Sequence, residues 1–145
     1  MASTAYQAVK QVVAALLGQT SAEDRVFLNL EAALEREESP AIIVEQASDN
    51  SEAYGKDVDK NALRFKVLFL ARSDDWQTEL DEVREATHRI ITSDPVLSDL
   101  LVGIRRTSME AGAKNADLPL GFISQQYTGQ YISPTTQLNG ERSGF

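Results

Sequence analysis

A change of hydrophobic period near the middle of the chain constrains the fold more than any other feature. From Ala62 to Arg72 apolar residues alternate, which predicts a β-strand with one buried face. From Trp76 to Ile91 they recur every three or four residues, which predicts an amphipathic helix. The link between them, Arg72-Ser73-Asp74, is so short that the helix must fold back over the sheet. The predicted buried positions are Leu63, Phe65, Val67, Phe69 and Ala71 in the strand, and Trp76, Leu80, Val83, Thr87, Ile90 and Ile91 in the helix.

Polar residues predict where this helix begins and ends. Asp74 stands where an N-cap belongs, and Gln77 follows three residues later, as in a capping box. Acidic residues fill the early and middle turns, and Arg89 is expected in the last turn, an order that the helix dipole favours. These acidic residues are Asp75, Glu79, Asp81, Glu82 and Glu85.

The composition indicates one globular domain. With 145 residues, 42% of them hydrophobic and 25% charged, the chain can bury a core without covalent cross-links. The absence of cysteine excludes disulfide bonds and thiolate metal sites, and it fits a reducing compartment. The first ten residues lack a signal-peptide pattern, and the apolar runs are far shorter than the ~20 residues that cross a bilayer. We therefore expect a soluble, intracellular protein.

The formal net charge of −8 predicts an acidic surface. Such a surface repels nucleic-acid phosphates, so tight wrapping of DNA or RNA is not expected. It would also suit a channel through which DNA slides without binding, although solubility is the simpler explanation of the charge.

The first forty residues predict a helix and then a less regular stretch. Ser3 to Gly18 is expected to be helical, with Ser3 as N-cap and Gly18 at the C-terminal stop. From Ser21 to Glu38 the pattern fits a strand or a helix, and we predict a short strand at Arg25–Asn29 followed by a helical turn. The stripe expected on the first helix is Tyr6, Val9, Val13, Leu16 and Leu17.

Further strands surround the central pair. Ala41–Gln46 is rich in β-branched residues and predicts a short strand, whereas Ala47–Asn61 is polar and predicts a long surface loop or an extended hairpin. Asp94 and Pro95 predict the cap and first residue of a short helical turn at Val96–Leu101. Two more strands are expected at Val102–Ala111 and Phe122–Ser133, joined by a polar connection that contains Gly112, Asn115, Asp117 and Gly121.

These elements predict an α+β fold in a single domain: a mostly antiparallel, four- to five-stranded sheet with two main helices packed on it. The domain is expected to span residues 1–133, and residues 134–145 are expected to form a mobile tail. On the second face of the central strand, Leu68 and Leu70 need cover from the first helix or from another subunit. In the last strand, Ile123, Tyr127 and Tyr131 share one face, and Ser124, Gln126, Thr128 and Gln130 share the other.

No pattern of catalytic, cofactor-binding or metal-binding residues is recognisable. His88 is the only histidine, which excludes a two-histidine metal site, and we interpret it as a structural or surface residue. A calcium loop starting at Asp49 fails because Tyr54 and Lys60 stand where glycine and glutamate are needed. Trp76 is interpreted as a core or interface anchor.

The order of elements from Pro40 to Ser133 resembles that of the tail terminator proteins of long-tailed bacteriophages. The resemblance rests on the strand Ala41–Val44, the central strand and helix, the Asp94-Pro95 turn, and Leu118-Pro119-Leu120-Gly121 leading into Tyr127 and Tyr131. It implies a structural virion protein without catalytic activity or cofactor. Such a protein forms a homo-hexameric ring on the head-proximal end of the tail tube, stops tube polymerisation and offers the surface that joins the head.

The resemblance also implies partners and a location. The partners would be further copies of the chain, the tail tube protein and a head-completion or neck protein, with DNA passing through without specific binding and no membrane contact. The protein would act in the virion tail after assembly in the host cytoplasm. Two alternatives remain: another neck, head-completion or tube ring protein, and a non-viral ferredoxin-like module that binds a small ligand. The candidate interface comprises Asp49, Glu52, Tyr54, Lys56, Asp57, Arg64, Lys66, Leu68, Leu70, Gln126, Thr128 and Gln130.

Overall fold

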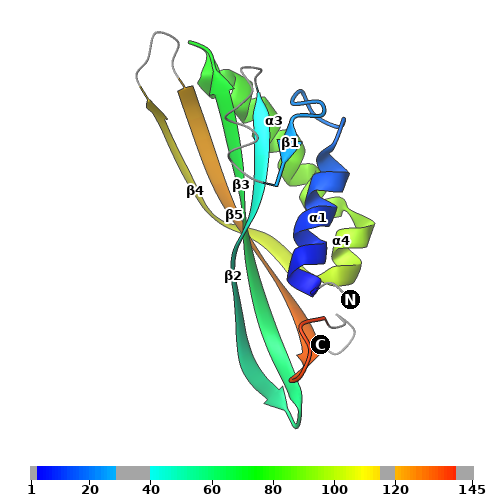
Figure 1. Ribbon diagram of the computed structural model, residues 1–145. Helices are drawn as coiled ribbons and strands as arrows, with labels where there is room; N and C mark the ends of the chain where they lie inside the picture. The colour runs from blue at the N-terminus through cyan, green and yellow to red at the C-terminus, as the bar shows by residue number, and fades with distance from the viewer. Residues whose placement is uncertain (1–2, 29–39, 115–119, 140–145) are drawn as a thin grey trace.

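The computed structural model describes residues 3–28, 40–114 and 120–139 of the chain. It shows one mostly antiparallel sheet of five strands with helices packed on it, which confirms the predicted single-domain α+β fold. The strand order is β1-β2-β3-β5-β4 (Figure 1). The described elements are α1 (Thr4–Leu16), β1 (Val26–Phe27), β2 (Ala41–Gly55), β3 (Val58–Arg72), α3 (Trp76–Ser93), α4 (Pro95–Leu100), β4 (Val102–Lys114) and β5 (Leu120–Pro134).

The core lies between the sheet and the helices, and β3 stands at its centre. All five side chains predicted for the buried face of this strand are fully buried there. Above them, α3 buries Leu80, Val83, Thr87 and Ile91, while Trp76 and Ile90 pack at the margin of the core, so the predicted stripe is confirmed. Burial of a Leu or Phe side chain contributes about 1.5–3 kcal/mol, which makes this contact a major source of stability.

The polar segment Ala47–Asn61 is not a loop. β2 continues through it to Gly55, and β3 starts at Val58, so the alternative of an extended hairpin is confirmed and the predicted end of β2 at Gln46 is wrong. β5 pairs with β3 as far as Val58 and Pro134, which adds a third strand to the projection. This projecting part, which we call the arm (residues 47–61 and 131–134), extends beyond the helices in Figure 1. Its polar sequence agrees with the finding that none of the described helices lies over it.

The observed ends of the helices agree only in part with the predicted ones. The N-cap of α3 is Asp75 and not Asp74, because residues 73–75 form a turn and the chain becomes helical only at Trp76. α3 continues to Ser93, so Arg89 does not lie in the last turn; it pairs with Glu85 at 3.5 Å. For α4, in contrast, Asp94 caps as predicted and its carboxylate accepts the Leu97 N–H at 2.8 Å.

The buried stripe of α1 agrees only in part with the predicted one. Val9 and Leu16 are buried and Val13 packs against the core, whereas Tyr6 and Leu17 are exposed. Ser3 is its N-cap, as expected, and Gly18 follows the helix in the left-handed conformation (φ 73°). Small residues, however, face the sheet, whereas Tyr6 is 49% exposed and carries Lys10 over its ring. Alanine is small, so it lets the helix pack close to the sheet. A prediction from the spacing of hydrophobic residues takes no account of their size and therefore misses this. The buried apolar residues are Ala5, Ala8, Val9, Val12 and Leu16.

Several strand boundaries differ from the predicted ones, and other predicted segments lie outside the described residues. β1 covers Val26–Phe27 of the strand predicted at Arg25–Asn29; Asn29 and the helical turn up to Glu38 lie outside. Gly112 and Gly121 belong to β4 and β5, whereas Asn115 and Asp117 of the predicted connection are not described. Pro134 ends β5, and the Thr4 N–H donates to the Leu138 carbonyl at 3.1 Å. Mobility of the chain beyond residue 134 stays a prediction.

The contact between Trp76 and Gly121 yields a prediction for stability. A Cβ atom at position 121 would overlap the indole ring, which is rigid and packs on the core. We expect Gly121→Ala to lower the free energy of unfolding by about 1–3 kcal/mol, the usual cost of overpacking. Urea denaturation measures the change. Gly55→Ala is the control, because an added Cβ there meets no atom within 4 Å; equal stability of both variants would contradict the packing of Trp76 on β5.

Candidate assembly surface

The three described helices cover one face of the sheet and leave the other without a helix. The core residues on β3 and those of α1 and α3 share the covered face, so α1 does not cover Leu68 and Leu70, and that alternative is wrong. Both leucines are half-buried. Ala41 and Ile43, their cross-strand neighbours, are buried, whereas from Glu45 toward the arm the side chains reach solvent. We call this second side of the sheet the open face.

The register assigns most of the candidate interface to the open face. Arg64 and Lys66 of β3 stand beside Thr128 and Gln126 of β5, and Gln130 lies one pair further toward the arm. Arg64 is exposed and the others are half-buried. The prediction of a polar stripe on β5 opposite its buried face is therefore confirmed, because β5 alternates strictly between half-buried and buried residues over this length.

The open face is basic although the chain is acidic. Among its described side chains, five are basic and three are acidic, which contrasts with the net charge of −8. Acidic residues instead gather on α3, at Glu79, Asp81, Glu82 and Glu85. The acidic surface expected from composition is thus not on this face. The basic residues are Lys60, Arg64, Lys66, Arg72 and Arg105, and the acidic ones are Glu45, Glu52 and Glu110.

Inside the arm, polar contacts replace the apolar core. Tyr131 donates its hydroxyl to the Asp49 carboxylate at 2.5 Å, and Asn61 donates its amide to the Ser133 hydroxyl at 2.8 Å. The Ser51 side chain also hydrogen-bonds Asn61. Burial and the neighbouring Asp49 charge raise the pKa of Tyr131 far above its ordinary value. Asp49, predicted as an interface residue, therefore faces inward and stiffens the arm, as its pairing opposite Leu63 requires.

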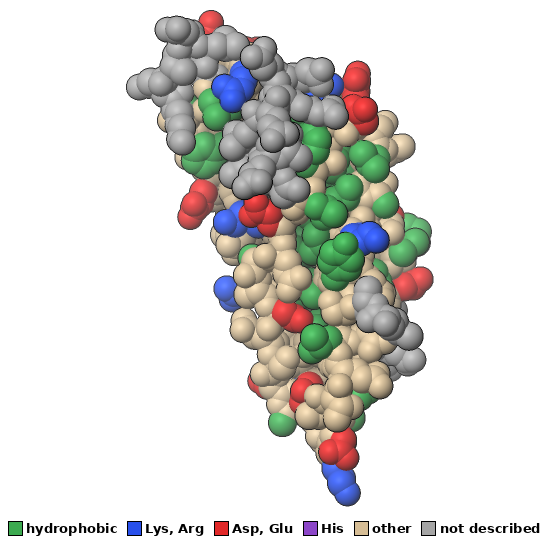
Figure 2. All heavy atoms as spheres, in the orientation of Figure 1, with side chains coloured by type: hydrophobic (Ala, Val, Ile, Leu, Met, Phe, Trp, Pro, Cys, Tyr) green, Lys and Arg blue, Asp and Glu red, His purple; other side chains and the backbone are tan. Residues whose placement is uncertain are grey.

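The remaining predicted interface residues lie at the exposed end of the arm. Glu52, Tyr54, Lys56 and Asp57 are all exposed, Tyr54 by 52%. Asp57 adopts a left-handed conformation (φ 61°) at the hairpin turn, and its carbonyl accepts the Thr135 N–H at 2.9 Å. Figure 2 shows charged side chains at the end of this projection. The arm therefore presents one large aromatic side chain amid charges of both signs.

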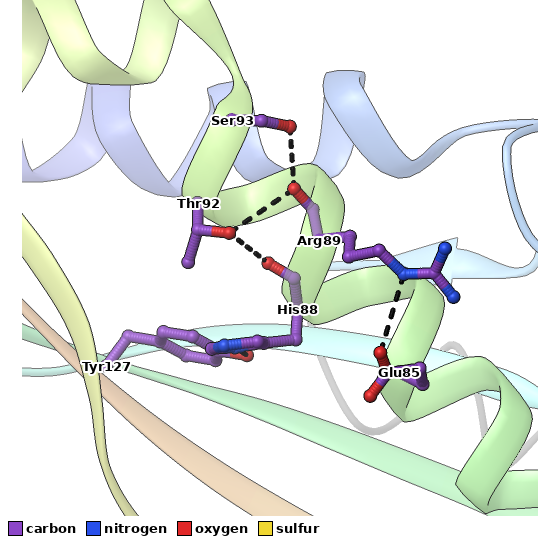
Figure 3. A network of polar contacts seen from close by, with 6 residues as sticks. All are labelled: Glu85, His88, Arg89, Thr92, Ser93 and Tyr127. Carbon is purple, nitrogen blue, oxygen red and sulfur yellow. Dashed lines mark hydrogen bonds and ion pairs between the residues drawn. The ribbon is translucent and has the colours of Figure 1, made fainter.

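A second polar network, drawn in part in Figure 3, joins α3 to the sheet. The Tyr127 hydroxyl lies 3.0 Å from His88 Nδ1 and accepts the Gln125 amide at 3.0 Å, and its ring stacks on Phe65. Burial raises the pKa of Tyr127 to about 12, against a smaller lowering effect of the Arg106 charge. His88 thus holds a helix in place, as its structural interpretation predicted. Sequence reasoning missed Gln125, although its position two residues before Tyr127 puts it on the core face.

In residues 3–28, 40–114 and 120–139, no group of three or more His, Cys, Asp or Glu side chains could hold a metal ion. None of the helices in the same residues is long and apolar enough to cross a membrane.

The buried Tyr127 hydroxyl predicts how stability responds to alkali. Its pKa is about 12 in the folded state and about 10 in the unfolded chain, so its contribution is complete below pH 10 and is lost as pH rises toward 12. Between these two pH values, one such tyrosine lowers the free energy of unfolding by up to about 1.4 kcal/mol per pH unit. Tyr127→Phe should be less stable at pH 8, because Gln125 loses a partner, but should lose stability less steeply above pH 10. Identical slopes in urea titrations would contradict this.

The hydrogen bond within the arm yields a separate prediction. Tyr131→Phe removes the hydrogen bond that the Asp49 carboxylate accepts from the Tyr131 hydroxyl. The other oxygen of that carboxylate, Asp49 Oδ1, already lacks a partner in the described structure. We expect a loss of about 1.5–3 kcal/mol in unfolding free energy, measured at pH 7 by chemical denaturation. Tyr6→Phe is the control, because Tyr6 is half-exposed and its ring keeps the contact with Lys10. An equally small effect of both substitutions would refute the role of the bond.

Comparisons with known proteins add no family to this picture. No protein-family model matches the chain, and no curated protein sequence matches it. The open face and the arm, with their charges and exposed groups, are therefore the features from which a function has to be inferred.

Proposed function

We propose that this protein is a structural component of a bacteriophage tail that acts by assembly and not by catalysis. Copies of the chain form a closed ring, expected to be a hexamer, on the head-proximal end of the tail tube. The ring ends tube polymerisation and offers the surface to which a head-completion or neck protein binds. DNA passes through the ring without specific binding. The proposal extends the resemblance in element order to the tail terminators.

The arm is the observation that carries this proposal. It projects beyond the helices (Figure 1), it ends in exposed Tyr54 and in charged residues, and within it the Tyr131 hydroxyl donates to the Asp49 carboxylate. A rigid projection with an exposed aromatic side chain loses little conformational entropy when a partner binds, which favours its use as a contact. We infer that the arm contacts the end of the tail tube.

The open face supports the same proposal. Half-buried Gln126, Thr128 and Gln130 lie beside Lys66 and Arg64, so this part of the face is polar. It suits the lining of a hydrated channel or a polar contact between subunits. Leu68 and Leu70, on the same face, remain for another subunit to cover. In a closed ring each copy offers two different surfaces to its neighbours, so the same contact repeats until the ring is complete.

Point substitutions in the arm test the proposal better than a deletion. Residues 50–55 belong to β2 and pair with residues 58–62 of β3, so a deletion of residues 50–58 would remove part of the sheet. We expect Tyr54→Ala combined with Lys56→Glu to leave the circular dichroism spectrum unchanged and to abolish capping. Capping is scored in electron micrographs as the length of tubes polymerised, with and without the variant, from the tube protein of the same genome.

Tyr6→Ala is the matched control, because Tyr6 is about as exposed as Tyr54 but belongs to α1 and not to the arm. The control and the unchanged protein should both limit tube length and show a mass of several chains by light scattering. Capping by the arm variant would show that the arm is not the contact. A single-chain mass, together with no binding to tubes, would contradict the proposed function, and binding to portals instead of tubes would favour a head-completion protein.

A further inference from the structure

The sheet ends in two long strand edges that no described strand covers. At one end, β4 pairs only with β5 among the described strands. At the other, β1 pairs with β2 only at Ile42 and Ile43, so the segment Val44–Gly55 of β2 pairs with β3 alone. The two uncovered edges are of similar length, because β4 spans Val102–Lys114. Each offers a row of backbone groups to which another strand can add.

We propose that these two edges join neighbouring copies of this chain, with β4 of one copy adding to the Val44–Gly55 edge of the next. The inference rests on the proposed ring and names the contact that closes it. The sheet would then continue from subunit to subunit, and the open faces would form one continuous surface around the ring.

Strand direction allows this contact without turning a subunit over. Neighbours along β2, β3, β5 and β4 are antiparallel, so β2 and β4 run in opposite directions within one sheet. If copies stand side by side in the same orientation, β4 of one and β2 of the next are again antiparallel. The contact uses two different surfaces, and such contacts generate rings when the rotation closes.

Charge favours this pairing over its two symmetric alternatives. The Val44–Gly55 segment carries Glu45, Asp49 and Glu52 and no basic residue. The sequence of β4 carries three basic residues against one acidic residue, and Arg105 and Arg106 are both exposed. Pairing β2 with β2, or β4 with β4, would bring like charges together, which destabilises a sheet. A β4–β2 contact brings opposite charges together.

The second half of β4 lacks the features that usually protect an edge. Register shifts and arginines lie between Val102 and Ser108, but from Ser108 to Ala113 the pairing is regular and Glu110 is the only charged residue. Met109 is 43% exposed, and a groove of about 580 Å³ beside it separates the edge from α3. That groove gives the side chains of an added strand room on the helix side.

Charge reversal on each edge tests the pairing. Arg105→Glu, or Glu45→Lys with Glu52→Lys, should each reduce the ring to single chains in light scattering, and all three together should restore it, because these side chains share the open face. The control, Asp74→Lys with Asp99→Lys, makes the same charge change as the β2 variant at exposed positions before α3 and on α4. Failure of the combined variant to recover the ring, while each variant and the control stay folded, would overturn complementary pairing.

Cross-linking gives a second test that does not depend on charge. The chain has no cysteine, so introduced cysteines report unambiguously. Ser48→Cys on β2 is combined in turn with cysteine at Arg105, Ser108 or Glu110 of β4, which share the open face with Ser48, and the full chain is oxidised in the ring or on capped tubes. We expect a ladder of covalent oligomers for at least one combination, and none when one edge alone carries cysteine.

The possible outcomes separate this inference from the proposed function. A ring that caps tubes but shows no β2–β4 cross-link overturns the inference and leaves the proposed function standing. Covalent dimers from β4 cysteines alone would show a symmetric contact, and cross-links to the tube protein would show a different occupant of the edge; either result overturns the inference. A chain that neither assembles nor binds tubes contradicts both.

Discussion

The pairing of β3 with a neighbour on each side is the interaction on which the rest of the structure depends. β3 pairs with β5 from one end to the other and with β2 from Val58 to Leu70, where two register shifts interrupt the ladder, so backbone hydrogen bonds align three long strands. Because side chains alternate, that register places Phe65 and Val67 under the helices and Asn61 within the arm. A slip by one residue would move every side chain of the strand to the opposite face of the sheet, so the register decides the composition of both faces.

This single ladder passes through two environments and meets each with different chemistry. Beneath α1 and α3 its covered face is apolar, and the buried polar groups near Tyr127 are hydrogen-bonded. Beyond the helices, the same face is held by Tyr131, Asp49 and Asn61, whose hydrogen bonds are made within the sheet. The arm can therefore remain ordered without a second layer, and it remains available to a partner.

The predictions that failed share a physical cause. Ala47–Asn61 lacks the apolar alternation of a strand because no helix covers the arm, and alternation reports burial and not strand geometry itself. The predicted stripe of α1 left out Ala5 and Ala8, because alanine is only weakly hydrophobic. Both residues are nevertheless buried, because they are small enough for close packing. The sequence also could not show that Asp49 stands opposite Leu63 and accepts a hydrogen bond from Tyr131, because the register of the hairpin is not known from the sequence.

The sequence alone determined the central strand and helix, their buried faces, the Asp94 cap and the α+β class, because each depends on local periodicity or on neighbours a few residues apart. Tertiary structure decided the rest. It placed α1 on the same side as α3, separated a basic open face from an acidic helix, and left the outer edges of β4 and of most of β2 uncovered by any described strand. These features arise from the pairing of strands far apart in the chain, and the composition of a segment does not specify which distant partner lies beside it.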